Sequence, residues 1–282
     1  MLEALVKGLL LFGVVLLLGA GLFPRFVGRF EHAKVVRPLL RAALVGAALI
    51  IIFSALNILT TLYGVLGFLE PSLVWDYTLA TAHGRATLVR IGLIIALVVL
   101  QVVITLPRRL SNTLYLTAGV GLLLSFSWVS HNASMGGWLP VIADLIHFAA
   151  ASAWAAAVLY TAFLPLWDEA ERSSLTSAMA RVSRIGLTTV ILLFLTGLYS
   201  AWLHVGAPSA LVTTRYGWAL VAKVGLVFII LGIAAINRWV LLPKLGTSAS
   251  LLGLSRALKV EAGLLCLVLG LTGLLSTSPV PH

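Results

Sequence analysis

Long apolar stretches recur along this chain of 282 residues, and they constrain its fold more than any other feature. A helix that crosses a lipid bilayer needs about 20 mostly apolar residues. Only 10% of the residues are charged, which leaves too little polar surface to cover a soluble globule. The sequence therefore predicts an all-α polytopic membrane protein with about eight transmembrane helices in one integral membrane domain, residues 1–282. The predicted spans are about 4–22, 39–66, 84–105, 113–130, 141–163, 182–204, 216–240 and 257–276.

One short segment occurs in both halves of the chain with the same internal spacing. Residues 81–84 read Thr-Ala-His-Gly and precede Arg90 by six positions, and residues 214–217 read Thr-Arg-Tyr-Gly and precede Lys223 by six positions. Each copy begins a long apolar stretch and places a cation about two turns inside it. We therefore predict an internally duplicated 4+4 bundle whose function lies where the halves meet. The predicted repeat halves are about 1–136 and 137–282.

Lysine and arginine mark one side of the predicted membrane. They cluster in the loops after the first, third, fifth and seventh stretches, whereas the opposite loops contain little more than Glu70, Asp76 and Arg215. The positive-inside rule then places the basic loops in the cytoplasm and both termini outside. The net charge of +10 is a topology signal on this interpretation, so we expect no nucleic-acid partner. The chain also contains no Walker-type phosphate loop, so we do not expect it to hydrolyse ATP.

Five of the six histidines fall on the side opposite the basic loops. Four of them lie at the ends of predicted spans or of the chain: His83, His131, His204 and His282. His147 lies about two turns inside the fifth stretch, one turn after Asp144. Interfacial histidines often cap helices or contact headgroups. Several on one side, with one inside a span, favour a site for a metal ion.

His131 and His147 are the predicted centre of this site. The loop between them is short, so we expect their spans to be antiparallel neighbours with the two rings facing each other. Asp144 is predicted to orient one ring or to offset the charge of the ion. We further expect His147→Ala to abolish binding more completely than His204→Ala, because His147 is held inside a helix. The further candidate ligands are His83, His204 and Met135. Imidazole, thioether and carboxylate groups are plausible ligands for copper, since soft donors favour Cu(I).

Three further charged residues and one tryptophan of the predicted spans are candidates for the site. Arg90 and Lys223 are predicted to occupy equivalent positions near the central interface, and the alternative is that they extend to the outer headgroups. Glu261 is a candidate partner for an intramembrane cation. Trp154, about two turns after His147, either lines the site or packs in the core. If Arg90 and Lys223 lined the path of a copper ion, they would repel it. The same cations would suit the propionates of a haem.

These residues resemble the CopD/PcoD family of copper-resistance membrane proteins over roughly residues 75–280. The family commonly has glycines after the tryptophan of span five, where this chain has three alanines at 155–157. The resemblance implies an eight-helix protein of the bacterial inner membrane that handles periplasmic copper and often works beside the small periplasmic copper carrier CopC. The matching elements are His131-Asn132-Ala133, Asp144-Leu145-Ile146-His147 with Trp154, residues 214–217 with Lys223, Asn237-Arg238 with Pro243-Lys244-Leu245, Glu261, and Ser276-Thr277-Ser278-Pro279.

Two functions of different classes fit these observations. In the first, a copper-handling permease or metal-transfer protein binds periplasmic copper at His131 and His147 and passes it inward or to a membrane enzyme. In the second, a membrane redox or assembly protein binds haem b between two histidines, and Arg90 or Lys223 holds the propionates. The resemblance favours copper, and a visible absorption spectrum distinguishes the two. We expect a transport or transfer protein more than an enzyme.

Overall fold

The computed structural model describes residues 1–27, 33–102, 106–164, 172–244 and 248–279, and the regular secondary structure of these residues is entirely helical. Eight of the described helices are long and apolar enough to cross a membrane, which confirms the predicted fold class. Three short helices were not predicted: α3 (Pro71–Ala80), α6 (His131–Ser134) and α9 (Ala210–Thr213). The long helices are α1 (Leu2–Phe26), α2 (Ala33–Leu66), α4 (Ala82–Val102), α5 (Arg108–Ser127), α7 (Trp138–Phe163), α8 (Arg172–Val205), α10 (Arg215–Ile236) with the short helical turns η2 (Asn237–Leu241) and η3 (Leu242–Lys244), and α11 (Ser248–Leu275).

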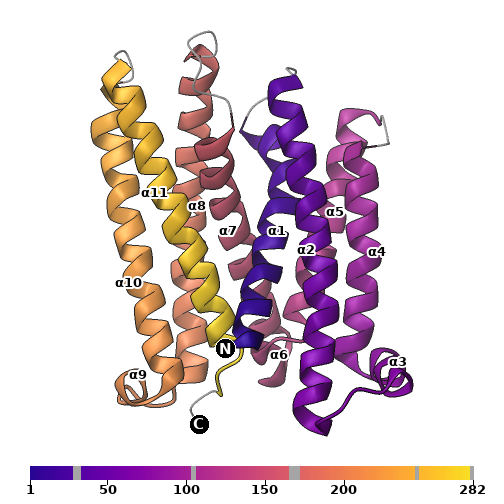
Figure 1. The fold of residues 1–282 in the computed structure, drawn as a ribbon. Helices are drawn as coiled ribbons and strands as arrows, with labels where there is room; N and C mark the ends of the chain where they lie inside the picture. Colours follow the sequence, from indigo (N-terminus) through magenta and orange to yellow (C-terminus); the bar gives the residue numbers. More distant parts are fainter. Residues whose placement is uncertain (28–32, 103–105, 165–171, 245–247, 280–282) are drawn as a thin grey trace.

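Helices α1 and α7 lie at the centre of the bundle. Helices α2, α4 and α5 lie on one side of them, and α8, α10 and α11 lie on the other (Figure 1). Helix α1 contacts α2, α7 and α11, while α7 contacts α5, α8 and α11. The first four long helices and the last four are therefore separate groups that meet through α1 and α7. The duplication itself remains a prediction.

Small residues let the central helices approach closely. A Cβ atom on Gly13 of α1 would lie 2.9 Å from the carbonyl oxygen of Gly46 in α2. A Cβ atom on Gly19 would lie 2.6 Å from the Cβ of Ala156 in α7. Such contacts drive helix association in a bilayer, where lipid is as apolar as the side chains and the hydrophobic effect between helices is absent. The alanines at 155–157 are all buried, and Ala156 lies at the contact with α1.

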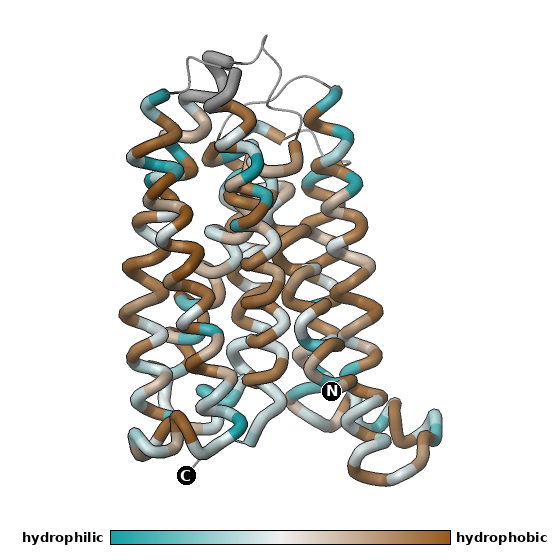
Figure 2. Tube along the Cα trace, turned by 60° about the vertical axis from the view of Figure 1, so that its left-hand side comes forward, coloured by the Kyte–Doolittle hydropathy of each residue, from teal (hydrophilic) through white to brown (hydrophobic). Residues whose placement is uncertain are grey.

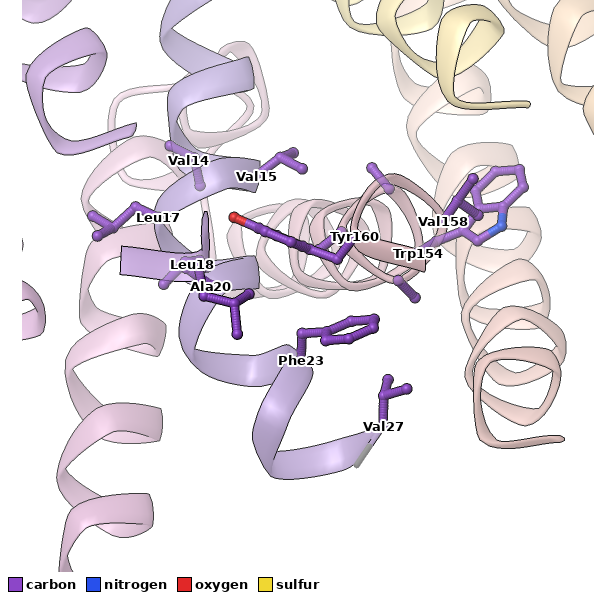
Figure 3. Close-up of a cluster of buried hydrophobic side chains, with 14 of the residues drawn as sticks. Val14, Val15, Leu17, Leu18, Ala20, Phe23, Val27, Trp154, Val158 and Tyr160 are labelled. Carbon is purple, nitrogen blue, oxygen red and sulfur yellow. The ribbon is translucent and has the colours of Figure 1, made fainter. Parts of the chain in front are cut away.

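Aromatic side chains complete the centre of the core (Figure 3). The rings of Phe23 and Tyr160 lie 5.6 Å apart, and the Tyr160 hydroxyl donates a hydrogen bond to the Leu16 carbonyl at 2.6 Å. Trp154 is 5% exposed and belongs to the same apolar cluster, but its side chain points to the opposite side of α7 from Tyr160 (Figure 3). This placement gives Trp154 a packing role in the core.

Apolar residues dominate the middle of the bundle, and hydrophilic residues gather at its two ends (Figure 2). The N-terminus, α3, α6, α9 and the end of α11 all lie at one end (Figure 1). We call this the histidine end, because α4 begins there beside His83, α6 begins with His131, and α8 finishes there beside His204. The opposite end, which we call the basic end, includes the end of α1 and the start of α5.

Candidate functional site

The repeated Thr-x-x-Gly segment has the same local structure in both halves. The Thr81 hydroxyl accepts a hydrogen bond from the Gly84 amide at 3.0 Å, and the Thr214 hydroxyl accepts one from the Gly217 amide at 3.0 Å. Each threonine thus caps the start of a long helix, α4 or α10. The glycines let the preceding short helix lie against that start. Gly84 approaches the backbone of α3, and Gly217 approaches the backbone of α9.

Arg90 is buried among helices of the first half. Its guanidinium donates hydrogen bonds to the Ser54 hydroxyl of α2 at 3.2 Å and to the Ser125 hydroxyl and carbonyl of α5 at 3.2 and 3.1 Å. The same group lies 3.6 Å from the centre of the Phe126 ring. With an exposed fraction of 2%, Arg90 does not extend to the headgroups.

Lys223 instead lies near polar residues of α7. It is close enough to Asp144 and His147 for their charges to interact. Glu261, which the sequence suggested as a partner for these cations, accepts a hydrogen bond from the Asn237 side chain. That suggestion is corrected for Arg90, because its described partners are hydroxyls, a carbonyl and an aromatic ring.

A polar network joins α6, α7 and α8 at the histidine end. The Asn132 amide donates hydrogen bonds to the Asp144 carboxylate at 3.2 Å and to the Ser200 hydroxyl at 3.4 Å. His131 is near enough to Asp144 and His204 to interact with both electrostatically. The side-chain carbonyl oxygen of Asn132 is buried without a hydrogen-bond partner. Buried polar atoms are normally paired, so an unpaired one marks a place where a water or a ligand belongs.

His204 carries a second unpaired atom in this region. Its Nδ1 lies 2.7 Å from the Ser200 carbonyl oxygen. A carbonyl can only accept, so Nδ1 carries a proton, and the nitrogen of this ring that can offer a lone pair is Nε2. That Nε2 is buried and has no hydrogen-bond partner. The ring is 4% exposed and stacks on Tyr216, with the centroids 6.3 Å apart. His204, a candidate ligand from the sequence, is thus buried more deeply than its place at the end of a span suggests.

His131 is held in a similar way from α6. Its Nε2 lies 3.0 Å from the Ser276 carbonyl oxygen, which also accepts a hydrogen bond from Lys7 at 2.9 Å. The same reasoning places the proton on Nε2 and leaves the lone pair on Nδ1. Partial burial lowers the pKa of His131, and the hydrogen bond to Ser276 offsets part of this effect. The ring is therefore neutral at physiological pH and able to bind a metal ion.

Among the described histidines, His147 lies deepest inside a membrane span. Its Nδ1 lies 2.9 Å from the Thr196 hydroxyl of α8, and that hydroxyl donates its own proton to the Leu192 carbonyl at 2.6 Å. The hydroxyl must therefore accept from Nδ1, and the lone pair of the neutral ring lies on Nε2. The sequence offered no sign that Thr196 would fix this tautomer.

The other two candidate ligands are placed differently. Nε2 of His83 lies 2.9 Å from the Asn57 amide nitrogen of α2, so this ring nitrogen already accepts a hydrogen bond. Met135 directly follows α6 and is 38% exposed. Among the described residues, no group of three or more His, Cys, Asp and Glu side chains lies close enough to hold a metal ion. The facing pair of His131 and His147 stays a prediction.

Two family profiles match this chain. Residues 1–142 match the description "Copper resistance protein D-like, N-terminal domain", and residues 176–275 match "Copper resistance protein D". The chain is 27% identical over 288 residues to copper resistance protein D of Pseudomonas syringae pv. tomato, an alignment that covers 96% of this chain and 90% of that protein.

Two further relatives are longer than the aligned region. The chain is 31% identical over 175 residues to inner membrane protein YebZ of Escherichia coli (strain K12), which covers 61% of this chain and 59% of the relative. It is 25% identical over 219 residues to copper transport protein CutJ of Bacillus subtilis (strain 168), which covers 75% of this chain and 40% of the relative. No solved structure matches the chain. The profile matches, which extend over both halves, show that this multi-pass membrane protein belongs to the copper resistance protein D family.

Proposed function

We propose that this protein binds copper at the histidine end and passes it into or across the bacterial inner membrane. The observation that carries the proposal is the buried, unpaired Nε2 of His204, which lies at the same end of the bundle as His131. A metal-binding histidine commonly has its second nitrogen fixed by a carbonyl or carboxylate, and both rings have this arrangement. The names of two relatives, copper resistance protein D and copper transport protein CutJ, agree with copper as the cargo.

The proposed ligands are neutral imidazoles supported by one carboxylate. His131 and His204 receive the ion first, and His147 is the next imidazole, deeper in the span. Met135 adds a thioether, a soft donor that suits Cu(I). Asp144 offsets the charge of the ion, and Asn132 holds that carboxylate in place by its hydrogen bond.

Lys223 gives this site a means of release. In the absence of copper, its ammonium group neutralises Asp144, with which it interacts electrostatically. An arriving copper ion competes with Lys223 for the carboxylate, and the repulsion between the two cations keeps copper from binding too tightly to leave. A transport site needs this property, because the ion must be able to leave as well as to enter.

The proposal includes an orientation, a partner and the duplicated architecture. The histidine end and both termini face the periplasm, since the basic loops belong to the cytoplasmic side. A small periplasmic copper carrier of the CopC type delivers the ion to this face. The two groups of four long helices are the halves of a duplicated 4+4 bundle, and α1 and α7 have equivalent places in them.

Copper titration of the purified protein tests the ligands. We expect His131→Ala and His204→Ala each to weaken copper binding by about 10-fold or more, since even supporting groups of a metal site are worth about 10–100-fold. His83→Ala is the matched control, because its Nε2 is occupied by Asn57. Full copper occupancy in both the His131 and His204 variants would contradict the site. A Soret band in the visible spectrum of the protein would favour the haem alternative.

A further inference from the structure

A second polar pair lies inside the membrane, away from the histidines. Glu261 of α11 is 2% exposed, and Asn237, where α10 passes into the π-helical turn η2, is 5% exposed. The Asn237 amide nitrogen donates a hydrogen bond to Oε1 of Glu261. The Asn237 amide oxygen, Oδ1, is buried and has no hydrogen-bond partner. π-helical turns are rare and occur frequently at functional sites.

This geometry is unfavourable for an ionised carboxylate. A carboxylate only accepts hydrogen bonds, so it leaves Oδ1 of Asn237 unpaired and keeps a charge in a region of low dielectric constant. A carboxylic acid removes both problems. One proton on the second oxygen of Glu261 neutralises the charge and donates to Oδ1, which closes a two-bond ring between the acid and the amide.

Several charged residues of the helices packed around Glu261 have described partners elsewhere. Lys7 of α1 binds the Ser276 carbonyl, and Arg25 of α1 binds Asn112. Arg238 of η2 binds Ser183, and Lys223 of α10 interacts with Asp144 and His147 of α7. On α11 itself, Arg256 and Lys259 are exposed. Asn237 is the side chain that donates the described hydrogen bond to Glu261, and it does so without adding charge.

We propose that Glu261 and Asn237 form an intramembrane proton-binding site and that Glu261 is protonated in the described state. We also assign to this site the coupling between copper movement and proton movement, and this assignment rests on the proposed function. The Glu261 carboxyl group releases its proton toward the histidine end as copper arrives, and the resulting carboxylate stabilises the passing copper cation. A proton from water at the basic end restores the carboxylic acid when the ion has left. One positive charge replaces the other, and no oxidant or reductant takes part.

Infrared spectroscopy of the full chain in lipid tests the proton directly. The C=O stretch of a protonated carboxyl group is well separated from the bands of a carboxylate. We expect a protonated-carboxyl band in the unsubstituted protein at neutral pH, its loss in Glu261→Gln, and its retention in the matched intramembrane control Asp144→Asn. Glutamine copies the size and hydrogen bonding of the neutral acid, so this variant should fold.

Carboxyl-labelled ¹³C-glutamate in the unsubstituted protein provides a second measurement that needs no substitution. The label should shift the band, because the group is a glutamate. A protein with no such band, a band that ignores the label, or a band that survives in Glu261→Gln would overturn the proton site. These readouts do not involve copper, so they decide the inference even if the histidines bind no metal.

Proteoliposomes loaded with a pH-sensitive dye test the coupling. We expect copper uptake by the unsubstituted protein to be accompanied by proton movement in the opposite direction. Glu261→Gln should bind copper at the histidine end as tightly as the unsubstituted protein and transport at least tenfold less. Copper uptake without proton movement, or unchanged transport by Glu261→Gln, would overturn the coupling. Failure of copper binding in the unsubstituted protein would instead refute the proposed function.

Discussion

Arg90 shows how a single residue can place a cation inside this bundle. Its guanidinium group is satisfied by two serines, one backbone carbonyl and the face of Phe126, all within the first half of the chain. Arginine suits this role because its N–H donors form a planar fork and the plane itself stacks on aromatic rings. The residue therefore ties α4 to both α2 and α5.

Arg90→Lys should destabilise the protein although the charge is kept. A lysine ammonium is a point charge that cannot bind Ser54 and Ser125 together while it covers the Phe126 ring. We expect a loss of about 1–3 kcal/mol, the usual cost of leaving buried polar groups unpaired. Thermal unfolding in detergent measures this effect. Arg85→Lys, at an exposed position of the same helix, should change stability by no more than about 0.5 kcal/mol, and an equal effect of the two changes would contradict this role.

The sequence indicates which residue types matter at the candidate site, but it does not indicate how they pair. His131 and Asp144 stand out because polar residues at span ends and inside spans are unusual. The burial of His204 depends on Tyr216, which belongs to another helix, and the tautomer of His147 depends on Thr196. Such partners are set by packing between distant segments, which a pattern along one helix does not contain.

At the scale of the elements, the long helices are the predictable part. The thickness of the bilayer demands long apolar stretches, and each predicted span overlaps one observed helix. Helix α11 begins at Ser248, earlier than the predicted 257, because a helix can continue through polar residues beyond the apolar core. The short helices α6 and α9 have only four residues each, too few to show a periodic pattern.

The repeated glycines give an element-level prediction. A methyl group on Gly84 would lie 2.4 Å from the backbone of Thr78, and one on Gly217 would lie 2.1 Å from the Ala210 carbonyl oxygen. We expect Gly84→Ala and Gly217→Ala each to lower stability by about 1–3 kcal/mol, because the short helix must move away. The measurement is thermal unfolding of each variant in detergent.

Matched controls for this prediction lie on the same two helices. A methyl group added to Gly92 of α4 or to Gly225 of α10 would meet no atom within 4 Å, and these two glycines have the same offset as Gly84 and Gly217. Alanine there should be neutral or stabilising by up to about 1 kcal/mol, since it favours helix formation. If all four variants behave alike, the close contact of α3 with α4 and of α9 with α10 does not contribute to stability.

At the scale of the whole molecule, the sequence predicts eight spans but not their lateral order. The central position of α1 and α7 follows from close contacts such as Gly13 with Gly46 and Gly19 with Ala156. These contacts depend on which faces of the helices meet, and the apolar residues on all faces of a membrane helix hide that information. By contrast, the N-terminus, α3, α6 and α9 all lie at one end because two long helices separate each of them from the next.

The orientation of the bundle in the membrane decides whether the histidines can receive periplasmic copper. The basic end carries Arg25, Arg108 and Arg238, whereas the segments that join the long helices at the histidine end contain Glu70 and Asp76, and Arg215 begins α10 there. Positively charged residues near span ends are retained on the cytoplasmic side, so the histidine end should face the periplasm.

Reporter fusions in cells measure this orientation. Alkaline phosphatase fused after residue 282 should be active, because it folds only outside the cytoplasm, and the same enzyme inserted in the segment 106–112 should be inactive. A fluorescent protein that matures only in the cytoplasm should give the reverse pattern. Cytoplasmic behaviour of the C-terminal fusion would turn the histidines toward the cytoplasm and remove the periplasmic delivery of copper from the proposed function, while leaving the ligand geometry of His131 and His204 to be tested by copper titration.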